Sequence, residues 1–277
     1  MYTRAQVLKR LRAQVGAGHP LVGAGAGSGI SAKYAERGGA DLILVYNSGK
    51  FRMAGHGSNA GLLAIGDANA IVLEMGERDV LPVVRETPVI AGVNGTDPTR
   101  VMPIFLARVA DTGFSGVINF PSHGLLDGRW RQSLEATGFG YDREVEMIRT
   151  AHRRDLFTLS YSFTPDEARA MADAGADVVV AHMGLTTGGE IGAQGSWAKS
   201  LDQCAVLINE IAEAARAVNP EVMVVCHGGP LETPADVRAV LAETDVQGFI
   251  GASTMERLPV ETAIEGAVRG FKDLALR

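Results

Sequence analysis

The sequence is poor in cysteine and has no long apolar segment. Its 277 residues include only two cysteines, Cys204 and Cys226, too few for a disulfide framework, so both are expected to be buried thiols in a reducing compartment. No stretch approaches the roughly 18 uninterrupted apolar residues of a membrane-spanning helix, and residues 1–15 lack the apolar core of a signal peptide. We therefore expect a cytoplasmic protein with no membrane partner.

Basic residues are also not clustered. Lys and Arg number 26 against 32 Asp and Glu, for a formal net charge of −6, and the longest basic blocks are pairs such as Arg153-Arg154. Contacts to a nucleic-acid backbone need a concentrated positive surface. The composition therefore argues against a nucleic-acid partner.

What the sequence does contain is an alternation of short apolar runs and helical stretches, which is typical of βα units on a parallel sheet. Runs such as 178–181 are apolar on both faces, as expected of strands covered by side chains on both sides. The length suits one barrel of about 250 residues. We predict an α/β fold, a (β/α)8 TIM barrel forming a single domain over residues 1–277; the alternative is an open, doubly wound sheet of five or six strands. The predicted strands are 21–24, 42–46, 89–93, 116–120, 156–161, 177–181, 222–226 and 248–250.

Helix signals between the runs agree with this pattern. Thr164-Pro165-Asp166-Glu167 combines an N-cap, a proline at the first helical position and a capping-box glutamate. Part of this signal recurs at Thr233-Pro234, before a predicted helix over 235–242, and at Asp97-Pro98, before one over 99–110. A helix over residues 3–15 is expected to cross the bottom of the barrel. Glycines stand where helix C-termini take a left-handed residue, at Gly113, Gly138 and Gly175.

Residues directly after the strands decide function, because the active face of such a barrel is formed by the loops at the strands' C-terminal ends. His182 and His227 follow the sixth and seventh apolar runs at equivalent positions. Adjacent parallel strands lie about 4.8 Å apart, so the two imidazoles should face one cavity. There they would act as general acid and base or as metal ligands.

Two groups of loop residues are candidates for binding an anion. After the second strand, Arg52 is the predicted charge partner, with Tyr46, Asn47 and Ser48 as neutral partners. After the seventh and eighth strands, glycines and hydroxyls offer the backbone N–H groups and short polar side chains that many barrels use to hold a phosphate. That second set comprises Gly228, Gly229, Gly251, Ser253 and Thr254.

The sequence does not decide the roles of the other residues at the strand ends. Asn94, Asn119 and Tyr161 could point into the mouth and polarise a carbonyl or stabilise an oxyanion. Asp97 is interpreted as a helix N-cap and not as a metal ligand. Glu190, in a glycine-rich loop, is a weaker candidate for a catalytic base that closes over the site.

Two common chemistries are disfavoured. The segment 23–29 is rich in glycine, but the acidic residue expected about 20 positions later in a dinucleotide site is replaced by Tyr46-Asn47-Ser48, so no nucleotide cofactor is expected. The place where a Schiff-base aldolase carries lysine, the end of the sixth strand, is occupied by His182, which argues against imine catalysis. Whether a divalent metal such as Mg²⁺ takes part is left open.

Several strings resemble the phosphoenolpyruvate hydrolase-like TIM-barrel family, also labelled as phosphonopyruvate hydrolases. A similar domain forms the C-terminal part of plant tobamovirus-resistance proteins. The strings are 25–33 (GAGSGISAK), 46–49 (YNSG), 51–55 (FRMAG), 66–70 (GDANA), 181–189 (AHMGLTTGG) and 226–230 (CHGGP). The resemblance implies a barrel of the phosphoenolpyruvate/pyruvate type. The Asp-x-Asp-x-Gly-aromatic-Gly segment of well-characterised phosphonopyruvate hydrolases is absent, and no catalytic residue is carried over.

These observations lead to one functional hypothesis and one alternative. We expect a hydrolase or lyase that acts on a small pyruvate-like phospho-, phosphono- or oxo-acid, with His182 and His227 handling protons or holding a metal. The alternative is a non-catalytic barrel that senses a small anion or binds a protein. By analogy with barrels of this group, a homo-oligomer is expected.

Overall fold

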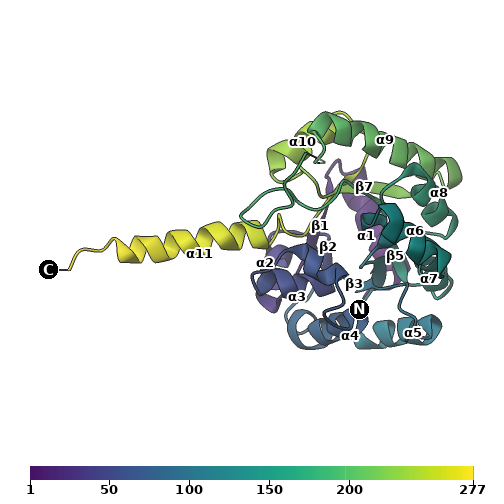
Figure 1. Ribbon diagram of the computed structural model, residues 1–277, viewed down its shortest axis with the longest axis horizontal. Coiled ribbons are helices and arrows are strands. Elements are labelled where there is room, and N and C mark those ends of the chain that lie inside the picture. The colour runs from purple at the N-terminus through teal and green to yellow at the C-terminus, as the bar shows by residue number, and fades with distance from the viewer. Residues whose placement is uncertain (197, 277) are drawn as a thin grey trace.

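Eight parallel strands close into a barrel in the computed structural model, which describes residues 1–196 and 198–276 (Figure 1). Each strand pairs with the next along the chain, and the last pairs with the first. The predicted (β/α)8 fold is thus confirmed, and each strand end lies within one residue of its predicted position. The strands are β1 (Leu21–Gly25), β2 (Leu42–Val45), β3 (Val89–Val93), β4 (Gly116–Asn119), β5 (Phe157–Ser162), β6 (Val178–His182), β7 (Met223–His227) and β8 (Gly248–Gly251).

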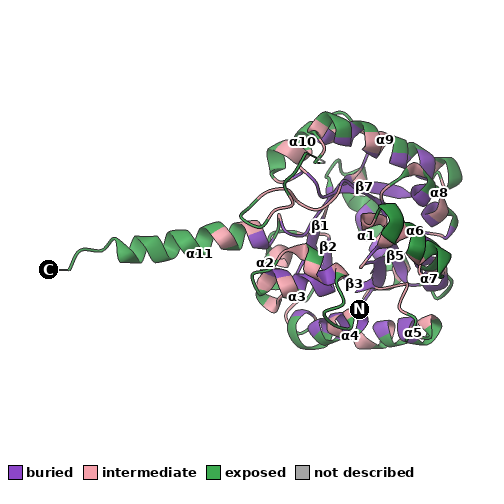
Figure 2. Cartoon of the chain, in the orientation of Figure 1, coloured by how far each residue is buried: buried purple, intermediate pink, exposed green. Residues whose placement is uncertain are grey.

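Most helices lie in a ring outside the barrel, with their buried faces toward the strands and their exposed faces outward, whereas the C-terminal helix projects away from the barrel (Figure 2). They are α1 (Arg4–Gly16), α2 (Gly29–Arg37), α3 (Asn47–Met53), α4 (Ala68–Met75), α5 (Met102–Thr112), α6 (Gly128–Ala136), α7 (Tyr141–Arg153), α8 (Pro165–Asp173), α9 (Leu201–Val218), α10 (Pro234–Ala242) and α11 (Arg257–Lys272). Three short turns of helix lie in the loops, η1 (Ser58–Leu62), η2 (Gly76–Val80) and η3 (His123–Leu125).

Most of the predicted helix boundaries are confirmed. The Thr164 side chain accepts a hydrogen bond from the Glu167 N–H at the start of α8, and Thr233 caps α10 in the same way. The glycines expected at helix ends have positive φ angles of 113°, 83° and 90° at Gly113, Gly138 and Gly175. These local signals work because they depend only on nearby backbone groups.

The start of α5 was predicted wrongly. Asp97 does not cap this helix, which begins at Met102 after Val101. Instead, one Asp97 carboxylate oxygen accepts from the backbone and hydroxyl of Thr99, and the other accepts from Asn69. These bonds hold residues 97–99 in a local turn, which delays the helix.

The barrel interior is filled by alternate residues of each strand. On β5, Phe157, Leu159 and Tyr161 belong to the inner apolar cluster, which also contains Tyr46 and Phe120. The interior is therefore a packed core and not a pore.

Helix α1 closes the N-terminal end of the barrel. Val7 and Leu11 pack into the inner cluster, and the Arg4 guanidinium lies 2.7 Å from the Asp177 carboxylate, just before β6. The predicted position of this helix is confirmed. Loops surround the opposite end of the barrel, which is formed by the C-terminal ends of the strands. This end is called the mouth below.

Two further expectations concern the thiols and the membrane. Cys204 and Cys226 are buried and unpaired, and burial raises the pKa of their thiols to about 11 and about 12. Within the described part of the chain, no helix combines the length and the apolar character needed to cross a membrane.

Candidate functional site at the barrel mouth

The two predicted histidines come together at the mouth. His182 and His227 end β6 and β7 and are register partners, and their ring centroids are 4.5 Å apart. The side chains point inward because their strand positions continue the inward set of Val178 and Val180 on β6 and of Val225 on β7. Their exposed fractions are 3% and 7%. The mouth therefore contains a nearly enclosed imidazole pair.

Hydrogen bonds to the backbone assign different tautomers to the two rings. The Gly184 N–H donates to Nδ1 of His182 at 3.0 Å, so the proton of the neutral ring is on Nε2. Nδ1 of His227 lies 2.6 Å from the Ile250 carbonyl oxygen and must donate, so its Nε2 carries a lone pair. The pair thus offers one N–H donor and one proton acceptor.

Both imidazoles are neutral in the free protein. Burial lowers the pKa of His227 to about 4 and lowers the pKa of His182 well below its ordinary value, with the neighbouring His227 adding to the effect. A neutral ring can donate or accept a hydrogen bond without bringing charge into the barrel.

Aromatic side chains pack against the two histidine rings. The Tyr161 ring lies 4.7 Å from that of His182 and 5.1 Å from that of His227, and Phe163 packs on His182 at 4.6 Å. The Tyr161 hydroxyl bonds that of Tyr46 at 2.7 Å. Burial raises the pKa of both tyrosines, so each stays a neutral phenol.

Arg52 does not present its charge to the mouth, contrary to its predicted role as an anion partner. Its guanidinium contacts the Glu256 carboxylate, with Nε at 3.1 Å and Nη2 at 3.0 Å from the same oxygen, and both side chains are 1% exposed. The other Glu256 oxygen accepts from the Gly27 N–H at 2.7 Å. This buried ion pair neutralises Arg52 and joins the loops after β1, β2 and β8.

Of the other predicted residues of the β2 loop, Ser48 contacts the ion pair and Asn47 bonds the backbone of η1. Ser48 accepts from Arg52 at 2.9 Å, and the Asn47 side chain donates to the Gly61 carbonyl at 2.9 Å. Both residues are buried. The glycine-rich turn after β1 packs here as well, because a Cβ atom on Gly27 would overlap the Gly49 backbone. The glycines therefore permit contact between neighbouring loops.

The loops after β6 and β7 are joined through their backbones. Gly228 and Gly229 have left-handed φ angles of 77° and 60°. The Gly229 N–H donates to the Gly184 carbonyl at 2.9 Å, and the Thr187 N–H donates to the Gly229 carbonyl at 3.2 Å. The Gly229 amide is thus already bonded and is not the free anion donor that was predicted.

The β8 loop supplies small polar groups. Ser253 is buried with its hydroxyl 3.4 Å from that of Ser58. The Thr254 hydroxyl is buried and has no hydrogen-bond partner among the described residues. Gly251 leaves space for the side chains of Thr254 and Met255. Thr254 lines a hollow of about 470 Å³ on the outer wall of the barrel, together with Val22 and Phe249, so its hydroxyl does not face the histidine pair.

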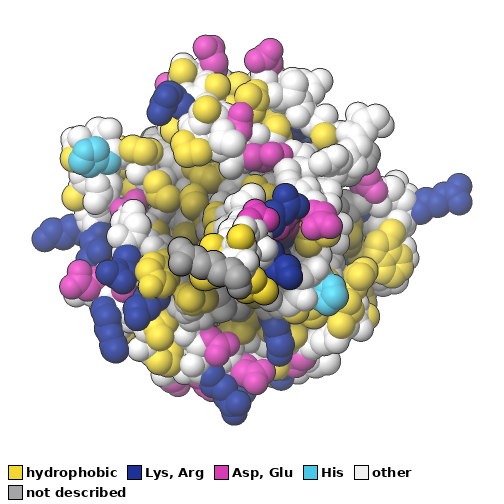
Figure 3. All heavy atoms as spheres, turned by 90° about the vertical axis from the view of Figure 1, so that its left-hand side faces the viewer, with side chains coloured by type: hydrophobic (Ala, Val, Ile, Leu, Met, Phe, Trp, Pro, Cys, Tyr) yellow, Lys and Arg dark blue, Asp and Glu magenta, His cyan; other side chains and the backbone are white. Residues whose placement is uncertain are grey.

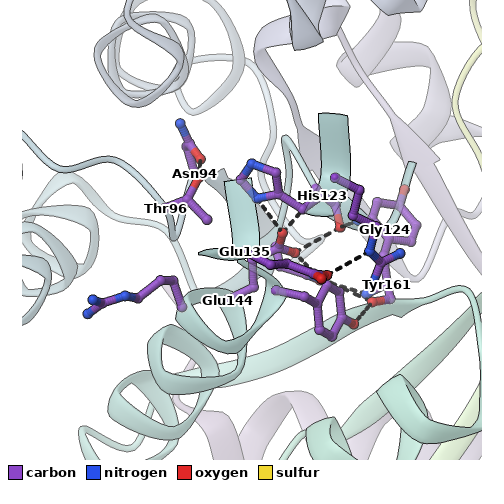
Figure 4. A network of polar contacts seen from close by, with 12 residues as sticks. Asn94, Thr96, His123, Gly124, Glu135, Glu144 and Tyr161 are labelled. Atoms are coloured by element: carbon purple, nitrogen blue, oxygen red, sulfur yellow. Dashed lines mark hydrogen bonds and ion pairs between the residues drawn. The ribbon is translucent and has the colours of Figure 1, made fainter. Parts of the chain in front are cut away.

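Asn119 points away from the mouth, so its predicted position beside a developing oxyanion is wrong. Its amide donates to Glu144 at 2.6 Å and accepts from the Tyr161 N–H at 2.6 Å, and the residue is fully buried. Figure 4 shows the network around Glu144, whose carboxylate also accepts from Ser122 and from the His123 N–H. Asn119 therefore fixes β4, β5 and α7 to one another.

Asn94 and His123 lie beside a separate cavity at the same end of the barrel. This cavity has a volume of about 450 Å³ and lies between the loops after β2, β3 and β4. The Asn94 side chain accepts from Thr96 at 2.8 Å, and His123 Nδ1 is 3.4 Å from the buried Glu144 carboxylate (Figure 4). Sequence reasoning did not single out His123 or Glu144, although Glu144 is a charged residue on the buried face of α7.

Glu190 is exposed and lies at the rim of another cavity. That cavity, of about 680 Å³, is lined by residues of α3, of the loop after β6 and of the first turns of α11. The Glu190 N–H is 3.4 Å from the Glu261 carboxylate. The structure therefore places Glu190 beside α11 and its acidic side chains.

A preformed metal site is not among these features. Within residues 1–196 and 198–276, no three His, Cys, Asp or Glu side chains lie close enough to hold a metal ion. The imidazole pair has no carboxylate partner in its hydrogen bonds, since both Nδ1 atoms bond the backbone. The residues at the histidine pair thus do not form the ligand set that Mg²⁺ prefers, which is rich in oxygen.

The fold and the polar loops at the strand ends define a (β/α)8 barrel with its candidate site at the mouth. The chain belongs to the phosphoenolpyruvate hydrolase-like family, whose sequence model matches residues 6–274.

The chain is similar over nearly its whole length to two tomato proteins and to a solved barrel structure. The chain is 56% identical over 274 residues to the ToMV susceptible protein tm-1(GCR26) of Solanum lycopersicum and 55% identical to the ToMV resistance protein Tm-1(GCR237) of the same plant. Each match covers 99% of this chain and 36% of the relative, so the chain spans about a third of their length. A crystal structure of phosphonopyruvate hydrolase with oxalate and Mg²⁺ is 20% identical, covers 96% of this chain and 87% of that one, and has a TM-score of 0.57. This last likeness shows the fold alone.

Proposed function

We propose that this barrel is an enzyme, a hydrolase or lyase that cleaves a carbon–oxygen–phosphorus, carbon–phosphorus or carbon–carbon bond in a small pyruvate-like acid. The observation that carries the proposal is the neutral imidazole pair, in which Nε2 of His182 is a donor and Nε2 of His227 is an acceptor. The family and the fold of phosphonopyruvate hydrolase support the substrate class.

In this proposal the two histidines have complementary roles. His227 accepts a proton from water or substrate through its Nε2 lone pair, while the His182 N–H stabilises the oxygen on which negative charge develops. An anionic substrate raises the pKa of a neighbouring imidazole, which offsets the effect of burial on His227. The Ser253 hydroxyl, in the loop after β8, holds the substrate anion.

In this proposal the proton transfers need no metal ligand from this chain. Activity is therefore to be measured both with added Mg²⁺ and with a chelator. We further propose that the protein works in the cytoplasm as a homo-oligomer, on a small anionic substrate and without a nucleotide cofactor.

The test is a thermal-shift screen of phosphoenolpyruvate, phosphonopyruvate and related 2-oxo acids, followed by product analysis. A ligand at 100 times its dissociation constant adds about 2.7 kcal/mol to the stability of the native state. Stabilisation together with release of phosphate, pyruvate or a smaller acid supports the enzyme. Absence of both stabilisation and product with every acid contradicts it.

A second candidate is a non-catalytic barrel that senses a small anion or binds a protein. It is favoured by the names of the tomato relatives, which refer to virus resistance and susceptibility, and by the near-complete enclosure of the histidine rings. In the same screen, a sensor is stabilised by an acid that it leaves chemically unchanged.

A further inference from the structure

Glu144 is a carboxylate that the proposed reaction does not use, and its burial distinguishes it. On the face seen in Figure 3, Asp and Glu side chains lie at the surface, several of them beside Lys or Arg. Glu144, on α7, is 0% exposed, and among the described residues the only basic side chain that pairs with it is that of His123. Its carboxylate accepts hydrogen bonds from Asn119 at 2.6 Å, from Ser122 at 2.8 Å and from the His123 N–H at 2.7 Å. A buried charge without a fixed counter-charge lowers stability, and these bonds offset part of that cost.

Asn119 completes the pairing between β4 and β5 at the mouth. The register pairs of these two strands end at Ile118 and Leu159, whereas β5 continues to Ser162. Beyond that point the Asn119 side chain bonds Tyr161 in place of a backbone group. Its Oδ1 accepts from the Tyr161 N–H at 2.6 Å, and its Nδ2 donates to the Tyr161 carbonyl at 3.2 Å. A side-chain amide offers the same donor and acceptor as a peptide group, so Asn119 extends the pairing toward the end of β5.

Glu144 determines which way round this amide lies. An Asn side chain turned by 180° about its last bond exchanges the places of its oxygen and nitrogen. In the turned position Nδ2 would face the Tyr161 N–H and Oδ1 would face the Glu144 carboxylate, so neither pair could bond. Because an ionised carboxylate only accepts hydrogen bonds, Glu144 selects the orientation in which Oδ1 bonds Tyr161.

Tyr161 in turn lies against both histidines. Its ring centroid is 4.7 Å from that of His182 and 5.1 Å from that of His227. Phe163, just after β5, lies 4.6 Å from His182. Each imidazole is bonded to the backbone at Nδ1, so the packed aromatic rings limit its rotation about that bond and thereby set the direction of Nε2.

We propose that Glu144 is a positioning residue for the histidine pair. It acts through Asn119, which holds the end of β5, and through the Tyr161 ring, which packs on His182 and His227. Figure 4 shows Glu144 and Tyr161 in this network. The effect on turnover rests on the proposed function, whereas the orientation of the imidazoles is measurable without a substrate.

The test is Glu144→Gln, followed by ¹H–¹⁵N NMR of protein labelled with ¹⁵N-histidine. In this variant the remaining oxygen can still accept from the His123 N–H, but the new amide nitrogen faces Nδ2 of Asn119. Two donors then meet, so Asn119 turns or moves and the Tyr161 N–H loses its acceptor. The ring-nitrogen signals of His182 and His227, assigned with single His→Asn variants, should shift or broaden.

A second buried carboxylate provides the matched control. Asp177 is 7% exposed and pairs with Arg4 at the opposite end of the barrel. Asp177→Asn should lower the stability of the barrel but leave the signals of His182 and His227 in place. An effect that is common to both variants would come from general destabilisation.

The reversed pair of substitutions provides a rescue. In Glu144→Gln with Asn119→Asp, the amide nitrogen at position 144 donates to the carboxylate at position 119, whose other oxygen accepts from the Tyr161 N–H. The histidine signals should return toward their wild-type positions. Ser122→Ala removes one donor to Glu144 and is the milder variant, which should move the same signals by less. It decides the question if Glu144→Gln does not fold.

Kinetics separate this proposal from the proposed function. With a substrate identified, Glu144→Gln should lower kcat by about 10- to 100-fold and change KM little, because misplaced catalytic groups slow the chemical step. Unchanged histidine signals in Glu144→Gln and Ser122→Ala, an equal change in Asp177→Asn, or no recovery in the reversed pair would overturn the positioning role. Shifted signals in Glu144→Gln with no turnover by the wild type would support that role and contradict the proposed enzyme.

Discussion

His182 and His227 are register partners on neighbouring strands, and their rings lie 4.5 Å apart at the mouth of the barrel. Each Nδ1 atom is bonded to the backbone, so the reactive nitrogen of each ring is Nε2. The packing of the barrel thus fixes the orientation and the tautomer of both rings before any ligand binds.

The buried histidines predict a stability that depends on pH. Burial lowers the pKa of His227 from 6.5 to about 4 on folding, so between these values the unfolded chain binds more protons than the native state. The free energy of unfolding should therefore be highest above pH 6.5 and fall by about 3 kcal/mol for this residue as the pH falls to 4. Urea unfolding at pH 7, 5.5 and 4.5 measures it. His227→Asn should show a smaller loss over the same range, and an unchanged pH dependence in that variant would contradict the assignment.

The Tyr46–Tyr161 hydrogen bond predicts a non-additive pair of substitutions. Tyr46→Phe or Tyr161→Phe leaves the other hydroxyl buried without its partner, which should cost about 1–3 kcal/mol. The double variant removes both hydroxyls and should cost no more than either single variant. A double-mutant cycle from urea unfolding tests this, and additive losses would show that the two hydroxyls do not depend on each other.

The Arg52–Glu256 ion pair predicts a large loss from a small change. Glu256→Gln leaves the Arg52 guanidinium buried without its counter-charge, and we expect a loss of about 3–5 kcal/mol in the free energy of unfolding. Asp173→Asn is the matched control, since it breaks the exposed pair with Arg149 and should cost less than about 1 kcal/mol. Similar losses in the two variants would rule out a special role for the buried pair.

The contact between the β1 and β2 loops predicts a steric effect at Gly27. A Cβ atom there would overlap the Gly49 carbonyl group, so Gly27→Ala should lower the free energy of unfolding by about 1–3 kcal/mol. Gly16→Ala is the control, because no atom lies within 4 Å of the added Cβ. A Tm for Gly27→Ala equal to that of Gly16→Ala would contradict the close packing of the two loops.

Much of the fold follows from local sequence patterns. The apolar runs predict all eight strands because buried parallel strands are apolar on both faces, and the caps at Thr164 and Thr233 depend only on neighbouring backbone groups. The meeting of His182 and His227 was also predictable, since equivalent positions on adjacent parallel strands lie side by side.

The remaining features depend on contacts between distant segments. Arg52 and Glu256 are 204 residues apart, and nothing near either residue indicates the other, so Arg52 was taken for an anion partner. Asn119 was expected in the mouth because it lies at the end of the fourth apolar run. Neighbouring strand residues face opposite sides, and Asn119 is on the side turned toward α7. Helix α11 projects from the barrel (Figure 1), and its own residues do not indicate whether it lies against the barrel wall.

The most direct test of the proposed enzyme is to remove Nε2 from both histidines while keeping their backbone bonds. In His182→Asn with His227→Asn, each amide can replace the Nδ1 bond to Gly184 or Ile250. The turnover of the best-stabilising acid is then followed by ¹H and ³¹P NMR for this variant and the wild type. The account predicts product from the wild type and a loss of turnover in the variant, with the cooperative unfolding transition retained. Turnover at the wild-type rate in the variant would contradict the account.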